Sequence, residues 1–184
     1  MDRTDAALVA DSLNGRQEAF GELVRRHQDA VYNLLYQITR NPQDAADLAQ
    51  DAFVKAYRKL EQYQPKYAFR NWVMTIAANT AKNRFRSLAR RRRAEEEHWT
   101  LRELNSAGKD DVQFAELEEA LASLPVKWRT PLVLKYMEGL SYDEIAAVLK
   151  IGVSAAKMRT LRGRERLREL LAPDAALIPG TAAG

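Results

Sequence analysis

Two consecutive stretches decide the fold of this chain: residues 44–60, which read DAADLAQDAFVKAYRKL, and residues 69–93, which read FRNWVMTIAANTAKNRFRSLARRRR. In both stretches apolar residues recur at helical spacing, which predicts two amphipathic helices separated by a loop over residues 61–68. The residues expected to face the core are Leu48, Ala52, Phe53, Ala56, Tyr57 and Leu60 in the first helix and Phe69, Trp72, Val73, Ile76, Ala77 and Leu88 in the second.

The polar faces of these two predicted helices differ in chemistry. The first helix presents an acidic face, which suits a basic protein partner. The second presents amides and cations, which suit nucleic acid. Either face by itself could be an ordinary solvated surface, but the two together are harder to explain in that way. The acidic face consists of Asp47, Gln50, Asp51 and Val54, and the cationic face consists of Thr75, Asn79, Lys82, Asn83, Arg86 and Arg90.

The composition restricts the possible functions. The chain has 184 residues, of which 46% are hydrophobic, enough for one ordinary domain or two small ones. It has no cysteine, which excludes a disulfide framework, and only two histidines, His27 and His98, both expected to be solvated. The glycines form no phosphate-binding loop, and no nucleophile, histidine and acid combine into a catalytic site. We therefore expect no cofactor, no metal centre and no enzymatic activity.

The amino terminus begins with acidic residues and has no apolar run of signal-peptide or membrane-spanning length. We therefore expect a cytoplasmic protein with no membrane insertion.

The net charge of +4 is unevenly distributed along the chain. Residues 1–93 have 17 Lys and Arg against 10 Asp and Glu, whereas residues 94–113 have 2 against 6. The positive charge is densest in the run of four arginines over residues 90–93, which is typical of a phosphate-binding patch or of a solvated helix end.

The segment before residue 94 is predicted to be a compact helical domain without strands. A short helix capped by Thr4 should end at Leu13, and a longer helix should cover residues 16–39. Asn41 and Pro42 then end that helix and open the next, because asparagine is a good N-cap and proline is tolerated at the first helical position.

Residues 94–113 break the helical pattern. They are acidic and contain the run Ser-Ala-Gly-Lys-Asp-Asp, which predicts an inter-domain linker with one helical turn near residues 99–104. Two further helices are expected over residues 114–124 and 127–138, and Pro131 would be tolerated in the second only within its first turn.

Residues 141–171 contain the most specific local signal. The run from Ser141 to Glu144 is a capping box that opens a helix ending at Lys150. A turn containing glycine follows, and Ser154 is expected to cap a final basic helix that ends near Leu171. This pattern is typical of a helix-turn-helix whose second helix enters a major groove, with a plain helical hairpin as the alternative. The tail over residues 172–184 is expected to be disordered.

The predicted fold class is therefore all-α, with two small helical domains, a flexible linker and a C-terminal helix-turn-helix. Three segments resemble the extracytoplasmic-function (ECF) sigma factors of the sigma-70 family: DAADLAQDAFVKAY, FRNWVMTIAANTAKNRFR and SLPVKWRTPLVLKYMEGLSYDEIAAVLKIGVSAAKMRTLRGRERL. The resemblance covers about Gly15–Leu171 apart from the linker. It implies sigma region 2 over residues 1–93, the linker over 94–113 and sigma region 4 over 114–171.

The resemblance also implies partners and site residues. The acidic face would dock on the clamp helices of the largest subunit of core RNA polymerase, and region 4 would meet the flap of the second largest. The loop over residues 61–68 would hold a base flipped out of the −10 element. Contacts with the melted −10 strand are implied for Lys66, Asn79, Lys82, Asn83, Arg86 and Arg90. Contacts with the duplex −35 element are implied for Ser154, Lys157, Met158, Arg159 and Arg162.

The recognition helix departs from the family pattern. Many members have Gly-Thr-Val where this chain has Ser154-Ala155-Ala156, so a −35 sequence preference cannot be transferred. The resemblance implies regulation by a separate anti-sigma factor. Two other hypotheses are a stand-alone helix-turn-helix regulator and a helical adaptor protein. Two DNA-facing surfaces of different chemistry in one chain favour the sigma factor.

Overall fold

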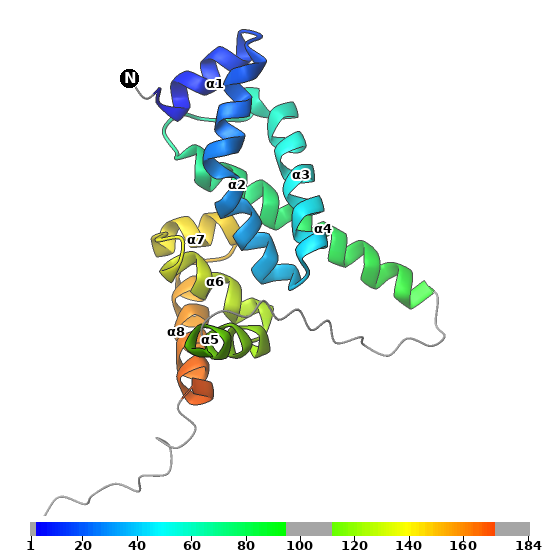
Figure 1. Cartoon of the computed structure of the whole chain (residues 1–184), viewed down its shortest axis with the longest axis vertical. Coiled ribbons are helices and arrows are strands. Elements are labelled where there is room, and N and C mark those ends of the chain that lie inside the picture. Colours follow the sequence, from blue (N-terminus) through cyan, green and yellow to red (C-terminus); the bar gives the residue numbers. More distant parts are fainter. Residues whose placement is uncertain (1–2, 95–111, 172–184) are drawn as a thin grey trace, which may run out of the picture.

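The computed structural model describes residues 3–94 and 112–171, and all the regular secondary structure within these ranges is helical (Figure 1). The sequence predictions for residues 95–111 and 172–184, including the helical turn near residues 99–104, lie outside the described residues. The elements in chain order are α1 (Asp5–Leu13), α2 (Gln17–Thr39), α3 (Pro42–Arg58), the 3-10 helix η1 (Leu60–Gln62), α4 (Phe69–Ala94), α5 (Val112–Ser123), α6 (Val126–Tyr136), α7 (Tyr142–Leu149) and α8 (Val153–Leu171).

The first four α-helices form the N-terminal domain, and their boundaries follow local signals. The Oγ1 atom of Thr4 accepts a hydrogen bond from the Ala7 amide at 3.3 Å, and the Oδ1 atom of Asn41 accepts one from the Asp44 amide at 2.9 Å. Both predicted N-caps are therefore confirmed. The core that these helices enclose includes Leu23, Val31, Leu35, Leu48, Phe53, Phe69 and Val73.

An aromatic cluster closes this core where the loop after η1 meets α4. The rings of Tyr63, Phe69 and Trp72 lie with their centroids 5.4–5.5 Å apart. Trp72 is therefore a packing residue, as its spacing predicted. The prediction that His27 is solvated is wrong. Its side chain is only 12% exposed, its Nε2 atom lies 2.8 Å from Oδ2 of Asp5, and its ring lies against Phe69.

The last four helices form the C-terminal domain, which contains the predicted helix-turn-helix. Ser141 and Glu144 make both hydrogen bonds of the capping box at the start of α7. Lys150 ends α7 in the left-handed conformation with φ of 53°, and α8 begins at Val153. Ser154 is therefore the second residue of α8 and not its cap, because the helix begins two residues earlier than expected.

Two further features fix the packing of α6. Pro131 lies in its second turn, contrary to the prediction that only the first turn would accept it, and it cannot donate a hydrogen bond to the Lys127 carbonyl. Helix α8 crosses α6 closely at Gly163, where a Cβ atom would lie 2.9 Å from the carbonyl oxygen of Trp128. A side chain larger than hydrogen at this position would force the two helices apart.

The two domains pack directly on each other. Leu34 on α2 and Met74 on α4, both fully buried, join an apolar cluster with Leu134, Leu140 and Ile145 of the C-terminal domain. Helix α6 lies against α2, and α7 lies against α4. The sequence predicted two domains joined by a linker, but it did not predict this contact between them.

Candidate polymerase and nucleic-acid interfaces

The acidic face predicted for residues 44–60 lies on the outside of α3. Asp47, Gln50, Asp51 and Val54 are all exposed, and the opposite side of the helix is buried against α2 and α4. This arrangement follows from the 3.6-residue period, which separates the apolar stripe from the polar one. In Figure 1, α3 lies on the side of α2 away from α7 and α8, so the acidic face points away from the C-terminal domain.

One residue of this helix differs from its prediction. Tyr57 was expected in the buried stripe, but its side chain is 44% exposed. Its ring packs edge-on against Phe20, with centroids 4.9 Å apart, and the remainder faces solvent. Val54 is also 44% exposed, so apolar groups lie among the carboxylates of the α3 face. Such a mixed surface is typical of a protein interface, where an apolar centre is surrounded by polar groups.

The loop between η1 and α4 presents a cation and an aromatic ring to solvent. The hydroxyl of Tyr63 donates a hydrogen bond to the carbonyl oxygen of Tyr67 at 2.7 Å, and burial raises the pKa of that hydroxyl. The ring of Tyr67 is 59% exposed, with Nζ of Lys66 4.9 Å from its centroid. Sequence reasoning identified Lys66 but missed Tyr67. The signal that could have found it is a tyrosine beside a lysine within a short loop, where a base can stack on the ring.

The predicted cationic face lies along α4. Lys82, Asn83 and Arg86 are exposed, and the side chain of Arg90 lies outside the described residues. Asn79 is half-buried, and its Nδ2 atom donates a hydrogen bond to the Thr75 carbonyl at 2.6 Å. This bond fixes the orientation of the amide. The Nζ atom of Lys55 lies 3.3 Å from Oγ1 of Thr80 and ties α4 to α3.

The candidate −35 residues lie along α8. Ser154, Lys157, Met158 and Arg162 are exposed, whereas Arg159 is half-buried. The turn before α8 and the buried side of the helix, at Ala156 and Thr160, set which residues face outward. These side chains include cations and one apolar thioether, a mixture that can contact phosphates and base edges in a major groove.

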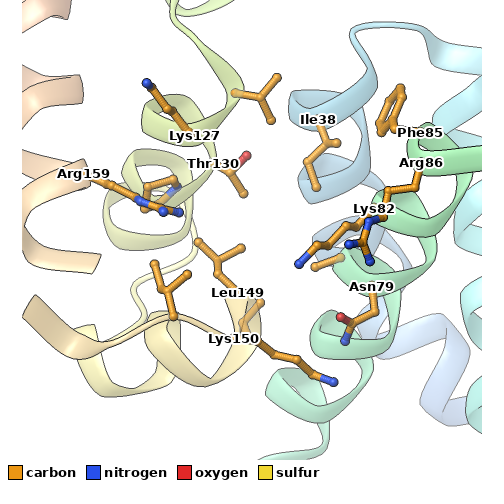
Figure 2. A pocket seen from close by; sticks show the side chains of 15 residues that line it. Ile38, Asn79, Lys82, Phe85, Arg86, Lys127, Thr130, Leu149, Lys150 and Arg159 are labelled. Carbon is orange, nitrogen blue, oxygen red and sulfur yellow. The ribbon is translucent and has the colours of Figure 1, made fainter. Parts of the chain in front are cut away.

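Residues from both predicted DNA-facing surfaces line one groove between the domains. Figure 2 shows Asn79, Lys82 and Arg86 of α4 on one side of it and Arg159 of α8 on the other. Lys127 and Lys150 add two more cations from the C-terminal domain, and none of the described residues that line the groove is a carboxylate. The described lining of the groove therefore includes five cations, together with apolar residues that include Ile38, Phe85 and Leu149. The sequence predicted the two cationic surfaces but not that they face each other.

This fold and these surfaces define an all-helical DNA-binding protein with a C-terminal helix-turn-helix. The family model for Sigma-70 region 2 matches residues 23–91, and that for Sigma-70 region 4 matches residues 114–167. The chain belongs to the ECF sigma factors of the sigma-70 family, which are non-enzymatic factors of transcription initiation.

Individual relatives match along most of their length. The RNA polymerase sigma-H factor of Pseudomonas aeruginosa is 34% identical, with 92% of this chain and 94% of the relative covered. The ECF RNA polymerase sigma-E factor of Haemophilus influenzae is also 34% identical, with 92% and 96% covered. The protein is therefore a sigma factor that binds core RNA polymerase and directs promoter recognition and melting. None of the helices described for residues 3–94 and 112–171 has the length and apolar character needed to cross a membrane.

Two solved structures have similar folds. CnrH, solved in complex with the cytosolic domain of CnrY, is 31% identical, with a TM-score of 0.68 over 92% of this chain and 98% of CnrH. The sigma factor RpoE of Bartonella quintana, solved in complex with the anti-sigma factor NepR, is 24% identical. Its TM-score is 0.72 over 84% of this chain and 98% of that structure, a likeness that concerns the fold alone.

Proposed function

We propose that this sigma factor docks on the clamp helices of core RNA polymerase through the α3 face formed by Asp47, Gln50, Asp51 and Val54. The observation that supports this most directly is the orientation of that face. It is acidic and exposed, and α3 lies on the side of α2 away from α7 and α8 (Figure 1), so a basic partner can bind it without competing with DNA at α8. In this proposal residues 1–93 form region 2, residues 94–113 form the linker and residues 114–171 form region 4, which meets the polymerase flap.

The −10 element is proposed to bind as a melted strand along the loop after η1 and helix α4. Exposed bases can stack on Tyr67 and receive hydrogen bonds from amides, while cations neutralise the phosphates. The residues proposed to make these contacts are Lys66, Tyr67, Asn79, Lys82, Asn83, Arg86 and Arg90.

The −35 element is proposed to bind as duplex DNA against α8. A helix fits the major groove, where arginine and lysine reach guanine edges and an apolar group reaches the thymine methyl. The proposed contacts are Ser154, Lys157, Met158, Arg159 and Arg162. The positive groove between the domains also suits an acidic segment of an anti-sigma factor, the kind of partner present in the RpoE complex. We place the protein in the cytoplasm, because promoter DNA and polymerase are there.

The docking proposal can be tested with Asp51→Arg. This substitution reverses one exposed charge on the α3 face, so it should abolish co-purification with core polymerase and leave the helical content unchanged. Asp29→Arg is the matched control, because Asp29 is an exposed aspartate on α2. Polymerase binding by the Asp51→Arg variant at the wild-type level would remove α3 from the interface.

The DNA-reading roles can be separated by the state of the template. In holoenzyme, Arg159→Ala should weaken recruitment to duplex promoters, with a loss of roughly 1–3 kcal/mol that disappears on templates without a −35 element. Asn79→Ala should leave initial duplex binding nearly intact and reduce open-complex formation, and a template melted beforehand at −10 should recover part of the loss. Permanganate footprints on matched templates report both effects. If pre-melting rescues Arg159→Ala and not Asn79→Ala, the two roles are wrong.

A further inference from the structure

The loop between η1 and α4 is exposed over residues 64–68, and a buried tyrosine ties it to the core of the N-terminal domain. The amide of Tyr67 donates a hydrogen bond to the Gln64 carbonyl at 3.1 Å, which closes a turn with Pro65 at its second position, where proline is favoured. The hydroxyl of Tyr63 donates a further hydrogen bond to the Tyr67 carbonyl at 2.7 Å. The turn is therefore fixed to the domain at the residue whose ring faces solvent.

The position of the Tyr63 hydroxyl is set by the core. Tyr63 is only 8% exposed, and its ring packs against Phe69 and Trp72 with centroid distances of 5.4 and 5.5 Å. A tyrosine side chain has only two torsions, and packing of the ring fixes both. Burial and the charge of Asp5 raise the pKa of Tyr63, so the hydroxyl keeps its proton at neutral pH. The loop is therefore held by a donor that is fixed in place and does not ionise.

Helix α1 supports the aromatic rings that hold Tyr63. The ring of Phe69 also lies against His27, with centroids 5.5 Å apart. Nε2 of His27 lies 2.8 Å from Oδ2 of Asp5, in the first turn of α1, and α1 packs against η1. This helix precedes residues 23–91, the part of the chain that the region 2 model matches. The support for the loop therefore includes an element outside the matched region.

The anchored turn determines how the proposed stacking surface is presented. The ring of Tyr67 is 59% exposed, with Nζ of Lys66 4.9 Å from its centroid. A ring in solvent projects in a fixed direction only if its own backbone is fixed. A strand that binds an ordered loop does not pay for ordering it. If only a fraction of the molecules has the loop ordered, the apparent affinity falls by that fraction.

We infer that Tyr63 is a positioning residue for the capture of a −10 base: its hydroxyl fixes the backbone of Tyr67, so that the exposed ring is already oriented for stacking when the melted strand arrives. Tyr67 contacts the base through its ring, and any extruded base offers a face for such stacking. Tyr63 acts through Tyr67 and does not touch DNA. This inference rests on the −10 role proposed above for the loop.

The anchoring can be tested in the free protein with Tyr63→Phe, which removes the hydroxyl and keeps the ring. NMR order parameters of the Lys66 and Tyr67 amides should fall well below the value of about 0.85 that is typical of rigid backbone, while that of Val73 on α4 stays unchanged. Tyr136→Phe is the matched control, because it removes the hydroxyl of an exposed tyrosine on α6. Unchanged order parameters in Tyr63→Phe would overturn the anchoring role.

The effect on base capture can be tested in holoenzyme. The probe is a promoter selected by this holoenzyme and melted beforehand at −10, with each base of the exposed strand removed in turn to leave an abasic site. Tyr67→Ala identifies the base that the loop captures, because removal of that base should weaken the wild type and make no difference in this variant. On the intact probe, Tyr63→Phe should bind about twofold to tenfold more weakly, the factor that one neutral hydrogen bond contributes to an equilibrium.

The abasic probe separates positioning from a general loss of structure. On the probe that lacks the captured base, Tyr63→Phe and wild type should bind equally, and Tyr63→Phe added to Tyr67→Ala should cause no further loss. Equal weakening of Tyr63→Phe on both probes would overturn the inference, because a merely structural change does not depend on the base. A captured base on which Tyr63→Phe depends as strongly as the wild type would refute the positioning role alone. If Tyr67→Ala identifies no base, the proposed −10 role of the loop fails, and the inference fails with it.

Discussion

Arg129 offers a quantitative test of how the C-terminal domain is stabilised. Its side chain is buried, with the residue only 3% exposed. Nη1 donates to the carbonyl oxygens of Ala122 at 2.7 Å, Leu124 at 3.2 Å and Leu121 at 3.3 Å, and Nε donates to that of Gln37 at 2.6 Å. One guanidinium therefore caps the end of α5 and reaches α2 of the other domain. Burial lowers the pKa of Arg129 to about 10, so the group remains charged at neutral pH.

We expect Arg129→Met to lower the free energy of unfolding by about 3 kcal/mol. A hydrogen bond from a charged group contributes about 1.5–3 kcal/mol, and a buried carbonyl left without a donor is penalised by about 1–3 kcal/mol. Four such acceptors would suggest a larger sum, but losses within one network are not additive. Methionine also removes the desolvation penalty of a buried cation, which offsets part of the loss. The expected value therefore lies at the upper end of the penalty for one unpaired buried polar group, about 1–3 kcal/mol.

The assay is thermal unfolding of the full chain followed by circular dichroism. For a protein of this size, 1 kcal/mol corresponds to about 2–4 °C, so Arg129→Met should lower the melting temperature by roughly 6–12 °C. Lys127→Met is the matched control, because it is the same exchange of a cation for an apolar group at an exposed position of the same helix, with an expected effect within about 0.5 kcal/mol. An Arg129→Met variant as stable as the wild type would refute the capping role.

Three further predictions concern the C-terminal domain. Gly163→Ala gains about 1 kcal/mol of helix propensity, but its Cβ would lie 2.9 Å from the Trp128 carbonyl oxygen, and overpacking loses about 1–3 kcal/mol of stability. Urea unfolding should therefore show a net loss of stability, and a variant more stable than the wild type would contradict this prediction. Ser141→Ala removes the α7 cap and should lower stability by about 0.5–2 kcal/mol in the same assay, whereas no change would mean that Glu144 alone suffices. Hydrogen bonds from Ser141 lower the pKa of Glu144, so the contribution of Glu144 to stability is present above its usual pKa and is lost as the pH falls. Burial raises the pKa of Glu138, so the contribution of Glu138 to stability grows as the pH falls. Unfolding between pH 6 and pH 3 should consequently show a weaker acid effect in Glu144→Gln and a stronger one in Glu138→Gln, and the reverse order would contradict both assignments.

Local signals in the sequence were sufficient to place most helices. Asn41 with Pro42 and Ser141 with Glu144 act within one turn of the backbone, so their effect does not depend on tertiary packing. Features that depend on a distant partner were predicted less well. The exposed part of Tyr57 depends on how Phe20 meets it, and the burial of His27 depends on Asp5 in another helix.

The candidate site shows the same difference between features set by local signals and features set by distant contacts. The α3 and α4 faces could be predicted from helical period and charge, because side chains on one helix keep a fixed relation to each other. The meeting of Lys82 with Arg159 across one groove could not, since it depends on how the domains dock. Met74 is informative here. It lies outside the predicted core stripe of its helix, and its complete burial is explained only by the second domain.

Different sides of α4 make different contacts, which limits how freely its sequence can change during evolution. One side packs into its own domain at Phe69, Val73 and Ala77, and another meets the second domain at Met74. The remaining side includes Lys82, which lines the groove between the domains. Between Phe69 and Ala81 no residue of α4 is exposed, so little of that surface is free to change. Saturation mutagenesis of these residues should find tolerated substitutions at isolated positions, whereas α1 should tolerate them along a whole exposed face.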